Sequence, residues 1–303
     1  MSDLGSVEVK MRPGNIAKKV LRCCRRLYHG FRTISAPAYR NPTESELIEI
    51  ERRIQSLNMP CHDFVVDSDE FMQFVQQAGF PSNYHGGIKG GVYFEKLLEH
   101  FVAWKLLKLG ESIHTPYVDV AACSSPWTKI LRGKGIESFA IDLSVPLESS
   151  GLGYYRQEDA TKTSFKDESI GGASLQCAYE MFVGYHDIEL LKEFSRILKP
   201  GGRAVISPLY THTRPCYYQT PEHYGKPYGD PGAQGYVRRD CWEVPSSRKY
   251  SPETLRTRVW DNAIKVGLVP SFHVLRNKDE LPEGIYLHFI LVLDKRLSEA
   301  RTV

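Results

Sequence analysis

The chain of 303 residues is long enough for one large domain with additions or for two small ones. Hydrophobic residues make up 42% and charged residues 25%, with a net charge of +3, which excludes a disordered or highly charged chain. It contains no apolar run of about 18 residues and no secretory h-region, so we expect neither a transmembrane helix nor a signal peptide. Its seven cysteines show no zinc-ligand or CxxC spacing, which favours reduced thiols and a cytoplasmic location.

The first region of the chain holds most of the positive charge. Residues 1–32 carry eight Lys and Arg and only two acidic residues. Apolar residues recur every three or four positions from Ile16 to Phe31 with basic residues between them, which predicts a basic amphipathic helix. One interpretation is contact of residues 10–32 with an anionic membrane surface, a nucleic acid or another partner. We favour the alternative, in which the apolar stripe packs on the body and the charges face water.

A group of helices is predicted after this arm. Thr43 and Glu46 have the spacing of a capping box, which predicts the start of a helix. Two more helices are expected at about 68–78 and 92–108, and Gly110 ends the second of these. This part of the chain is therefore expected to be helical throughout.

From residue 115 onward the pattern changes to alternating strands and helices, which predicts a parallel sheet with helical crossovers. We expect strands near 116–121, 137–142, 154–157, 171–177, 203–208, 269–275 and 285–293. We expect helices near 126–133, 187–198 and 252–266.

One long segment, residues 209–250, interrupts the alternation with seven Tyr, five Pro and four Gly. A connection of this length is usually functional, and its aromatic content argues against disorder, so we predict an ordered lid. We divide the chain into an N-terminal arm with its linker (1–40), a helical cap (41–112) and a core (113–303) that contains this insertion.

Acidic residues mark the ends of three successive predicted strands. Asp119 ends the first, Asp142 ends the second 23 residues later, and Asp159 follows the third. A spacing near twenty residues suits an acid that hydrogen-bonds the ribose hydroxyls of a nucleotide-like cofactor. Further on, the sequence Lys-Pro-Gly-Gly at 199–202 separates a predicted helix from an apolar strand.

These landmarks, from Tyr117 to about Pro208, resemble a class I S-adenosylmethionine-dependent methyltransferase. The resemblance implies an α/β fold: a Rossmann-like, mostly parallel sheet of seven strands with helices on both faces, plus the helical cap and the inserted lid. It implies S-adenosylmethionine as cofactor, with Asp142 on the ribose hydroxyls and Asp159 on the adenine amino group. We assign cofactor binding to Asp119, Ala121, Cys123, Ser124, Asp142, Leu143, Asp159, Ala160 and Gln176.

The turn after the first of these strands departs from the family pattern, which usually has glycine at the positions of Ala121, Cys123 and Ser125. A non-glycine residue costs roughly 1–2 kcal/mol in the left-handed conformation that glycine adopts freely. We therefore expect the turn to follow a less strained path, or the cofactor to lie slightly farther out. All three replacements are small, so we expect a modified but working site, with a lost cofactor site as the alternative.

The reaction implied is methyl transfer, which requires alignment, exclusion of water and, for a hydroxyl acceptor, a general base. The candidate catalytic residues, just beyond the fourth and fifth strands, are His186, His212 and Glu180. The candidate substrate-binding residues are Tyr185, Tyr210, Tyr217, Tyr218 and Trp242. Each of these could instead be a packing or surface residue. The sequence contains no metal-binding motif, so we expect no metal.

The function we favour is O-methylation of a small molecule such as a sugar, an aromatic or a natural-product intermediate. The alternatives are a non-catalytic binding or scaffold protein that keeps the fold and, less favoured, a nucleic-acid methyltransferase. The fourth strand ends in Gln-Cys-Ala-Tyr at 176–179 and not in the Asn/Asp-Pro-Pro-Tyr run of amino methylases. The rest of the chain, outside the basic arm, is also close to neutral, which argues against a long surface that binds the phosphates of a nucleic acid. We therefore expect a small-molecule acceptor and no nucleic acid, and we leave a homodimer open.

Overall fold

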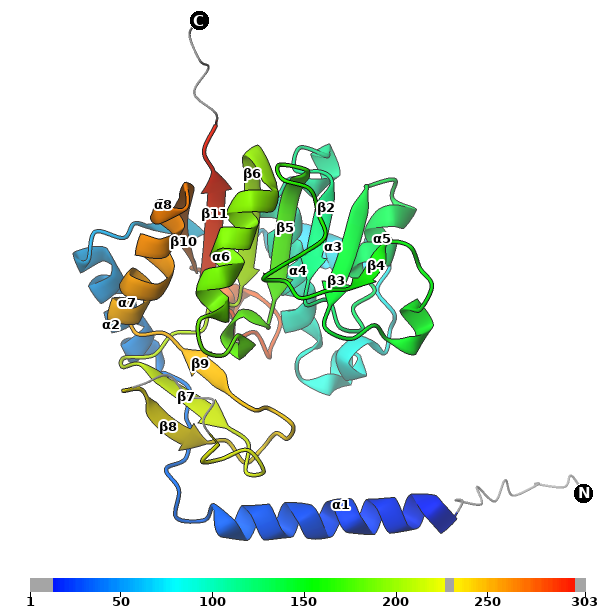
Figure 1. The fold of residues 1–303 in the computed structure, drawn as a ribbon, viewed down its shortest axis with the longest axis vertical. Coiled ribbons are helices and arrows are strands. Elements are labelled where there is room, and N and C mark those ends of the chain that lie inside the picture. Colours follow the sequence, from blue (N-terminus) through cyan, green and yellow to red (C-terminus); the bar gives the residue numbers. More distant parts are fainter. Residues whose placement is uncertain (1–12, 227–231, 298–303) are drawn as a thin grey trace, which may run out of the picture.

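A sheet of eight strands forms the centre of the computed structural model, which describes residues 13–226 and 232–297 (Figure 1). Its strands lie in the order β1–β10–β11–β6–β5–β2–β3–β4. Their bounds are β1 (Cys61–Phe64), β2 (Tyr117–Val120), β3 (Ser138–Asp142), β4 (Tyr155–Gln157), β5 (Ile170–Gln176), β6 (Leu198–Ser207), β10 (Leu268–Leu275) and β11 (Phe289–Lys295). β11 is antiparallel to both neighbours, and the other neighbouring pairs are parallel. The predicted α/β, Rossmann-like fold is therefore confirmed.

All seven predicted strands are present, and β1 is an additional one. β1 lies in the region that we expected to be helical throughout, so that expectation is wrong at residues 61–64. The sequence of β1, Cys-His-Asp-Phe, shows no alternation of apolar and polar residues. The strand instead pairs in parallel with β10 at the edge of the sheet. Its conformation is thus specified by pairing with a neighbour and not by its own pattern.

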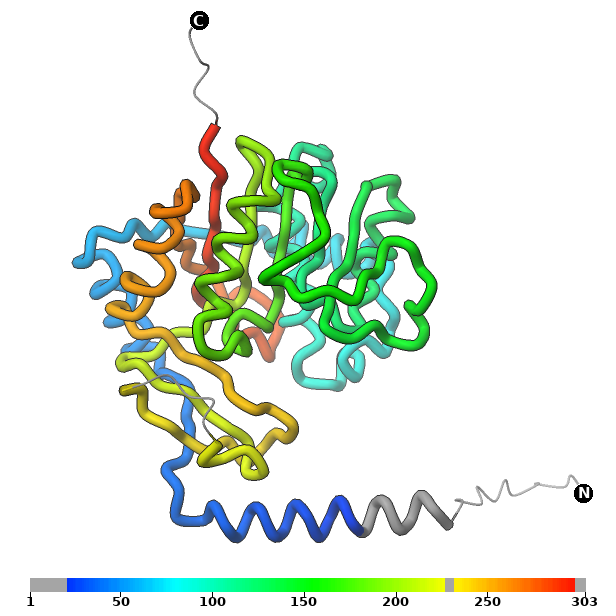
Figure 2. Tube along the Cα trace, in the orientation of Figure 1, coloured from blue at the N-terminus to red at the C-terminus, as the bar shows by residue number. Residues whose placement is uncertain are grey.

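Helices cover both faces of the sheet (Figure 2). On one face are α2 (Glu44–Ser56), α6 (His186–Ile197) and a continuous helical segment from α7 (Pro252–Thr254) to α8 (Asp261–Lys265). On the other are α3 (Ser68–Gln77), α4 (Tyr93–Leu106) and α5 (Trp127–Gly133). Successive side chains of a strand point to opposite faces, so in β2 Val118 packs with the first set and Tyr117 with the second. Buried apolar layers on both faces hold the edge formed by the strand ends in place.

The Lys-Pro-Gly-Gly sequence at 199–202 lies within β6 and not in a separate turn. It forms an irregularity in the ladder, because the register with β5 shifts between Ile170 and Gly172. Gly201 has a φ of 78°, a left-handed conformation that glycine adopts without strain. α6 therefore passes directly into β6 at Leu198.

The insertion at 209–250 carries a second, three-stranded sheet below the main one in Figure 1. In it, β7 (Cys216–Gln219) pairs in parallel with β8 (Gln234–Val237) and antiparallel with β9 (Ser247–Lys249). Residues 227–231 of the insertion lie outside the described residues. The role of the insertion as a lid and the domain boundaries stay predictions.

The predicted amphipathic helix is present as α1 (Pro13–Arg32), which extends away from the core at the lower edge of Figure 1. The expectation that its apolar stripe packs on the body is wrong, because Leu27 and Phe31 are 70% and 78% exposed. α1 instead contacts the insertion through basic side chains. None of the helices in the described ranges is both long and apolar enough to cross a membrane.

Candidate active site

The turn between β2 and α5 takes left-handed backbone conformations although it contains no glycine. Ala121 has a φ of 56° and Cys123 a φ of 47°. The expected less strained path is therefore wrong, and at 1–2 kcal/mol each the two residues cost roughly 2–4 kcal/mol. Ser125 is not left-handed, and its Oγ accepts a hydrogen bond from the Trp127 N–H at the start of α5 (3.2 Å).

Two side chains hold this strained turn in place. The Asp142 carboxylate, at the end of β3, accepts hydrogen bonds from the N–H groups of Cys123 (2.9 Å) and Ser144 (3.0 Å). The Tyr155 hydroxyl, from β4, donates to the Cys123 carbonyl. Hydrogen bonds to a charged group each contribute about 1.5–3 kcal/mol, so these contacts can offset the cost of the left-handed Cys123.

A cavity of about 360 Å³ opens beside Asp142, within the range of about 300–1,000 Å³ typical of small-molecule sites. Its walls are mostly apolar, and its three carboxylates come from the ends of β3 and β4 and the residues that follow. It is lined by Ala121, Ile141, Asp142, Leu143, Glu158, Asp159, Ala160, Ala178, Met181, Phe182, Val183 and His186. This combination suits the flat ring and the hydroxyls of a nucleoside.

Asp119, in β2, is buried beside the turn and does not line the cavity. Burial, with a smaller contribution from the Asp142 carboxylate, raises the pKa of Asp119 to about 8. Its Oδ2 atom has no hydrogen-bond partner among the described residues. The carboxyl group is therefore mostly protonated at neutral pH.

A second group of polar side chains lies at the carboxyl end of β5, where α4 crosses it. Lys96 Nζ is 2.6 Å from Cys177 Sγ and 2.8 Å from both Glu99 Oε1 and the Tyr286 hydroxyl. Cys177 Sγ is also 3.1 Å from Glu99 Oε1 and 3.2 Å from the Tyr210 hydroxyl. We call these five residues the Lys96 cluster.

Burial and neighbouring charges set the ionisation of the Lys96 cluster. Burial lowers the pKa of Lys96, but the Glu99 carboxylate raises it, and the resulting pKa lies above the usual range. Burial raises the pKa of Glu99, against the opposing effect of Lys96. Burial and Glu99 together raise the pKa of the Cys177 thiol, so it stays protonated at neutral pH and is a hydrogen-bond donor instead of a nucleophile.

The insertion adds a buried cation beside this cluster. Lys249, in β9, lies with its Nζ 3.6 Å from the centroid of the Tyr210 ring. Burial lowers the pKa of Lys249 to about 8, and Glu180 partly opposes this shift. Glu180 follows β5 and is also buried, which raises its pKa, while Lys249 partly lowers it. Glu180 Oε2 has no hydrogen-bond partner among the described residues.

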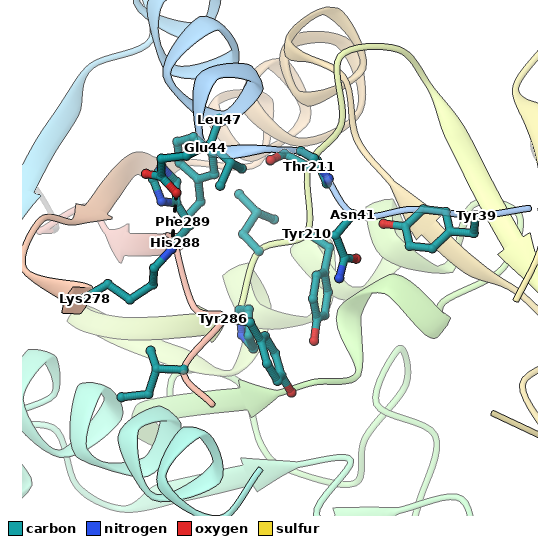
Figure 3. Close-up of a pocket in the computed structure, with 14 residues that line it drawn as sticks. Tyr39, Asn41, Glu44, Leu47, Tyr210, Thr211, Lys278, Tyr286, His288 and Phe289 are labelled. Atoms are coloured by element: carbon teal, nitrogen blue, oxygen red, sulfur yellow. Dashed lines mark hydrogen bonds and ion pairs between the residues drawn. The ribbon is translucent and has the colours of Figure 1, made fainter. Parts of the chain in front are cut away.

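A smaller cavity, of about 200 Å³, adjoins the Lys96 cluster through Tyr210 and Tyr286 (Figure 3). The two rings are stacked with centroids 6.3 Å apart, and their hydroxyls point to the same side in Figure 3. Both hydroxyls approach Cys177 Sγ, at 3.2 and 3.6 Å. The cavity therefore combines aromatic walls with a polar end.

Residues 118–206 match the family model described as "Methyltransferase domain". This range runs from β2 to β6 and includes the strained turn, Asp142 and most of the larger cavity. The chain contains a class I methyltransferase domain. The protein is a SAM-dependent methyltransferase, with S-adenosylmethionine as its cofactor.

Solved methyltransferase structures resemble the chain at low sequence identity. One is a 1,6-didemethyltoxoflavin-N1-methyltransferase from Burkholderia thailandensis with bound 1,6-didemethyltoxoflavin and S-adenosylhomocysteine. It has 14% sequence identity and a TM-score of 0.46, and the match covers 79% of this chain and 94% of that chain. Another is a putative methyltransferase of Haloferax volcanii in complex with the activator Trm112. It has 16% sequence identity and a TM-score of 0.42, and the match covers 77% of this chain and 99% of that chain. A third is an S-adenosylmethionine-dependent methyltransferase from Mesorhizobium loti. It has 16% sequence identity and a TM-score of 0.42, and the match covers 64% of this chain and 97% of that chain. The search of curated proteins finds no match.

The larger cavity of the methyltransferase fits its cofactor. The carboxylates of Asp142 and Asp159 are available to the ribose and the adenine amino group, and Ile141 and Phe182 offer apolar contact to the ring. Cys123 is exposed and does not line the cavity, so this bulkier replacement of a family glycine leaves the space open. The cofactor site is thus modified but not filled.

The structure brings some of the predicted cofactor residues to this cavity and not others. Those that line it are Ala121, Asp142, Leu143, Asp159 and Ala160. Ser124 is exposed, and Gln176 is held by a hydrogen bond to Ser174 Oγ (2.6 Å). Direct cofactor contacts by all nine predicted residues, those that line the cavity included, stay predictions.

The three predicted catalytic residues lie in different surroundings. Glu180 is buried beside Lys249, as described above. His186 begins α6 and lines the cofactor cavity, and its Nε2 is 3.8 Å from Glu189 Oε2. His212 is buried against Tyr39, and burial lowers the pKa of its imidazole. Glu180 and Lys249 each shift the pKa of the other, and Lys249 also contributes to the lowered pKa of His212.

The predicted substrate-binding residues are also dispersed. Tyr210 belongs to the Lys96 cluster, and the ring of Tyr218 lies 5.1 Å from Lys249 Nζ. Tyr185 is exposed, lies against Arg258 and lines a further cavity together with Lys249, whereas Trp242 lies against α1. The Tyr217 ring packs on the backbone of Gly235 in β8. A shared site is thus visible for Tyr210 and Tyr218.

Sequence reasoning assigned no function to Glu99, Cys177, Lys249 and Tyr286. Lys96 and Glu99 are three residues apart on one helix, a spacing that predicts an ion pair. Lys249 gives no such signal, because it lies in an aperiodic insertion. In the parts of the chain that the structure describes, no group of three or more His, Cys, Asp or Glu is placed to hold a metal ion.

Proposed function

We propose that the protein methylates a hydroxyl group of a small molecule bound between the Lys96 cluster and the insertion. The observation that carries the proposal is the segment at 177–183, which borders both sites. Ala178, Met181 and Phe182 line the cofactor cavity. Cys177 and Glu180, from the same segment, belong to the polar groups around Lys96 and Lys249. An acceptor among those groups would therefore lie next to the cofactor.

The side chains of this site suit a hydroxyl acceptor. S-adenosylmethionine, when bound, supplies an electrophilic methyl group and leaves as a neutral thioether. In the proposed mechanism the Glu180 carboxylate takes the hydroxyl proton as the oxygen–carbon bond forms. Lys249, which carries its charge below about pH 8, opposes the effect of burial and lowers the pKa of this carboxyl group. The aromatic walls of Tyr210 and Tyr286 exclude water and align the acceptor.

The two alternative functions are less well supported. A scaffold protein needs no buried carboxyl oxygen without a hydrogen-bond partner, such as Glu180 Oε2, because such an atom costs stability. A nucleic-acid methyltransferase requires exposed basic residues along a phosphate track, but of the two lysines at the proposed acceptor site Lys249 is buried and the side chain of Lys96 is 13% exposed.

The test separates the cofactor from the acceptor half of the site. Asp142→Asn removes the negative charge of the carboxylate that accepts a hydrogen bond from the turn after β2. We therefore expect S-adenosylhomocysteine to bind roughly 10-fold more weakly by calorimetry, in line with the loss of a charged hydrogen bond. Glu180→Gln should leave this affinity unchanged and lower turnover roughly 10²–10⁴-fold, as expected for a general base. Turnover is measured by mass spectrometry on a panel of sugars, phenols and other alcohols.

Three outcomes would contradict the proposal. If millimolar S-adenosylhomocysteine gives no heat with the unmodified protein, the scaffold alternative is favoured. If Glu180→Gln retains full turnover, Glu180 is not the base. If methylated amines or nucleic acids form while hydroxyl compounds stay unmodified, the acceptor class is wrong.

A further inference from the structure

The described contacts of α1 with the insertion come from basic side chains on one side of the helix. Arg22 Nη2 lies 3.7 Å from Glu243 Oε1, and the Arg26 guanidinium lies 5.1 Å from the centre of the Trp242 ring. At the end of the helix, Arg32 donates to the carbonyl of Tyr224 at 3.2 Å. All three contacts are to the insertion, which lies between α1 and the core in Figure 1.

The opposite side of α1 is apolar and uncovered. Leu27 is 70% exposed and Phe31 is 78% exposed. Nine positions separate Arg22 from Phe31, and at about 100° per residue this places them on opposite sides of the helix. The helix therefore presents its apolar stripe away from the protein, the reverse of the arrangement in which such a stripe covers a core.

The charges of α1 indicate what covers this stripe. The helix contains six Lys and Arg and no acidic residue. Arg25 is exposed and lies on the basic side of the helix, between Arg22 and Arg32 in angular position. An apolar stripe on a helix whose charges are all positive matches the boundary between acyl chains and anionic headgroups of a bilayer. A second copy of the helix would bring like charges together, and a nucleic acid has no use for the apolar residues.

We propose that α1 is an interfacial helix that binds the surface of an anionic lipid bilayer. Its apolar side, with Leu27 and Phe31, enters the boundary between headgroups and acyl chains. Arg22 and Arg26, on the other side, hold the insertion and with it the catalytic core above the surface. The helix lies in the plane of the membrane and does not cross it. This inference is independent of the acceptor proposed above.

The test is co-sedimentation of the full chain with vesicles. The vesicles consist of phosphatidylcholine alone or of equal amounts of phosphatidylcholine and phosphatidylglycerol. We expect binding to the mixed vesicles, much weaker binding to the neutral ones, and release as sodium chloride is raised. The double substitution Leu27→Glu with Phe31→Glu should reduce binding to the mixed vesicles roughly tenfold or more, because it removes apolar area and adds negative charge.

The matched control is Val65→Glu with Ile113→Glu, which changes two exposed apolar residues far from α1 in sequence. It should bind vesicles like the unmodified chain. Circular dichroism and the affinity for S-adenosylhomocysteine show whether each variant is folded. Equal binding of both double variants would overturn the proposal. So would a dimer in light scattering that Leu27→Glu with Phe31→Glu dissociates, or a gel shift with nucleic acid in the absence of vesicle binding.

Discussion

At the scale of single residues, the turn after β2 shows how a methyltransferase can do without the usual glycines. Ala121 and Cys123 take the left-handed conformation, and Asp142 and Tyr155 fix the second of them by hydrogen bonds. The turn thus takes left-handed conformations at two positions without glycine at either of them. The strain is present in the folded protein and should be measurable.

Ala121→Gly and Cys123→Gly should each increase the free energy of unfolding. Glycine removes a cost of roughly 1–2 kcal/mol at positive φ and adds an entropic cost of about 0.5–1 kcal/mol, so the net gain is about 0.5–1 kcal/mol. The matched control is Ala122→Gly, at a neighbouring residue that is not left-handed, which should lose about 0.5–1 kcal/mol. Urea unfolding measures all three. Destabilisation by all three substitutions would show that the turn is unstrained.

Asp119 should make stability depend on pH. The pKa of its carboxyl group is about 8 in the folded protein and about 3.9 in an unfolded chain. Between these values the folded state holds a proton that the unfolded state has released, so stability is full below pH 4 and falls as pH rises toward 8. Asp119→Asn stays neutral and should become progressively more stable than the unmodified protein from pH 5 to pH 9. Urea unfolding without cofactor measures this, and parallel pH profiles would contradict it.

The sequence predicted part of the site at this scale. Asp142 and Asp159 could be placed at the cavity because each follows a strand of a recognisable parallel sheet. The conformation of Cys123 could not, because it depends on hydrogen bonds from residues on two other strands. The same holds for Cys177, whose partners Lys96 and Tyr286 are distant in sequence.

At the scale of elements, α4 carries two ion pairs in different surroundings. Lys96 and Glu99 are buried, whereas Lys105 pairs with Glu70 of α3 at the surface, at 2.8 Å. The same substitution at the two lysines therefore separates the effect of burial from that of charge.

Lys96→Met should lower the free energy of unfolding by about 3–5 kcal/mol, because it leaves the buried Glu99 carboxylate without its cation. Lys105→Met, the control on the same helix, should cost at most about 1 kcal/mol. Urea unfolding at pH 7 compares the two variants. Similar losses for both would mean that Glu99 is protonated in the folded protein. In that case the double variant Lys96→Met with Glu99→Gln would be no more stable than the single variant Lys96→Met.

The elements differ in how well the sequence predicted them. The strands of the main sheet and its helices follow apolar periodicity and could be placed. β1 could not, because its four residues have no pattern and form a strand through pairing with β10. The strands of the insertion were missed because β7 and β8 pair in parallel across a long aromatic segment.

At the scale of the whole molecule, α1 stands apart from the body. Its described contacts are formed by exposed side chains, and it covers no part of the two main cores. Removal of residues 1–28 should therefore change the free energy of unfolding by less than about 1 kcal/mol, since exposed ion pairs contribute little. The affinity for S-adenosylhomocysteine should be unchanged. Urea unfolding and calorimetry check both, and a large loss of either would show that α1 supports the core.

The proposed acceptor site is assembled from two sources: the core supplies Glu180, and the insertion supplies Tyr210 and Lys249. The cofactor cavity, in contrast, is lined by residues of the core alone. Exchange of the insertion for a different one would thus alter which molecule is methylated while donor affinity is retained. The protein is in this sense modular, and new acceptor chemistry can evolve, or be engineered, by replacing one contiguous stretch of the gene.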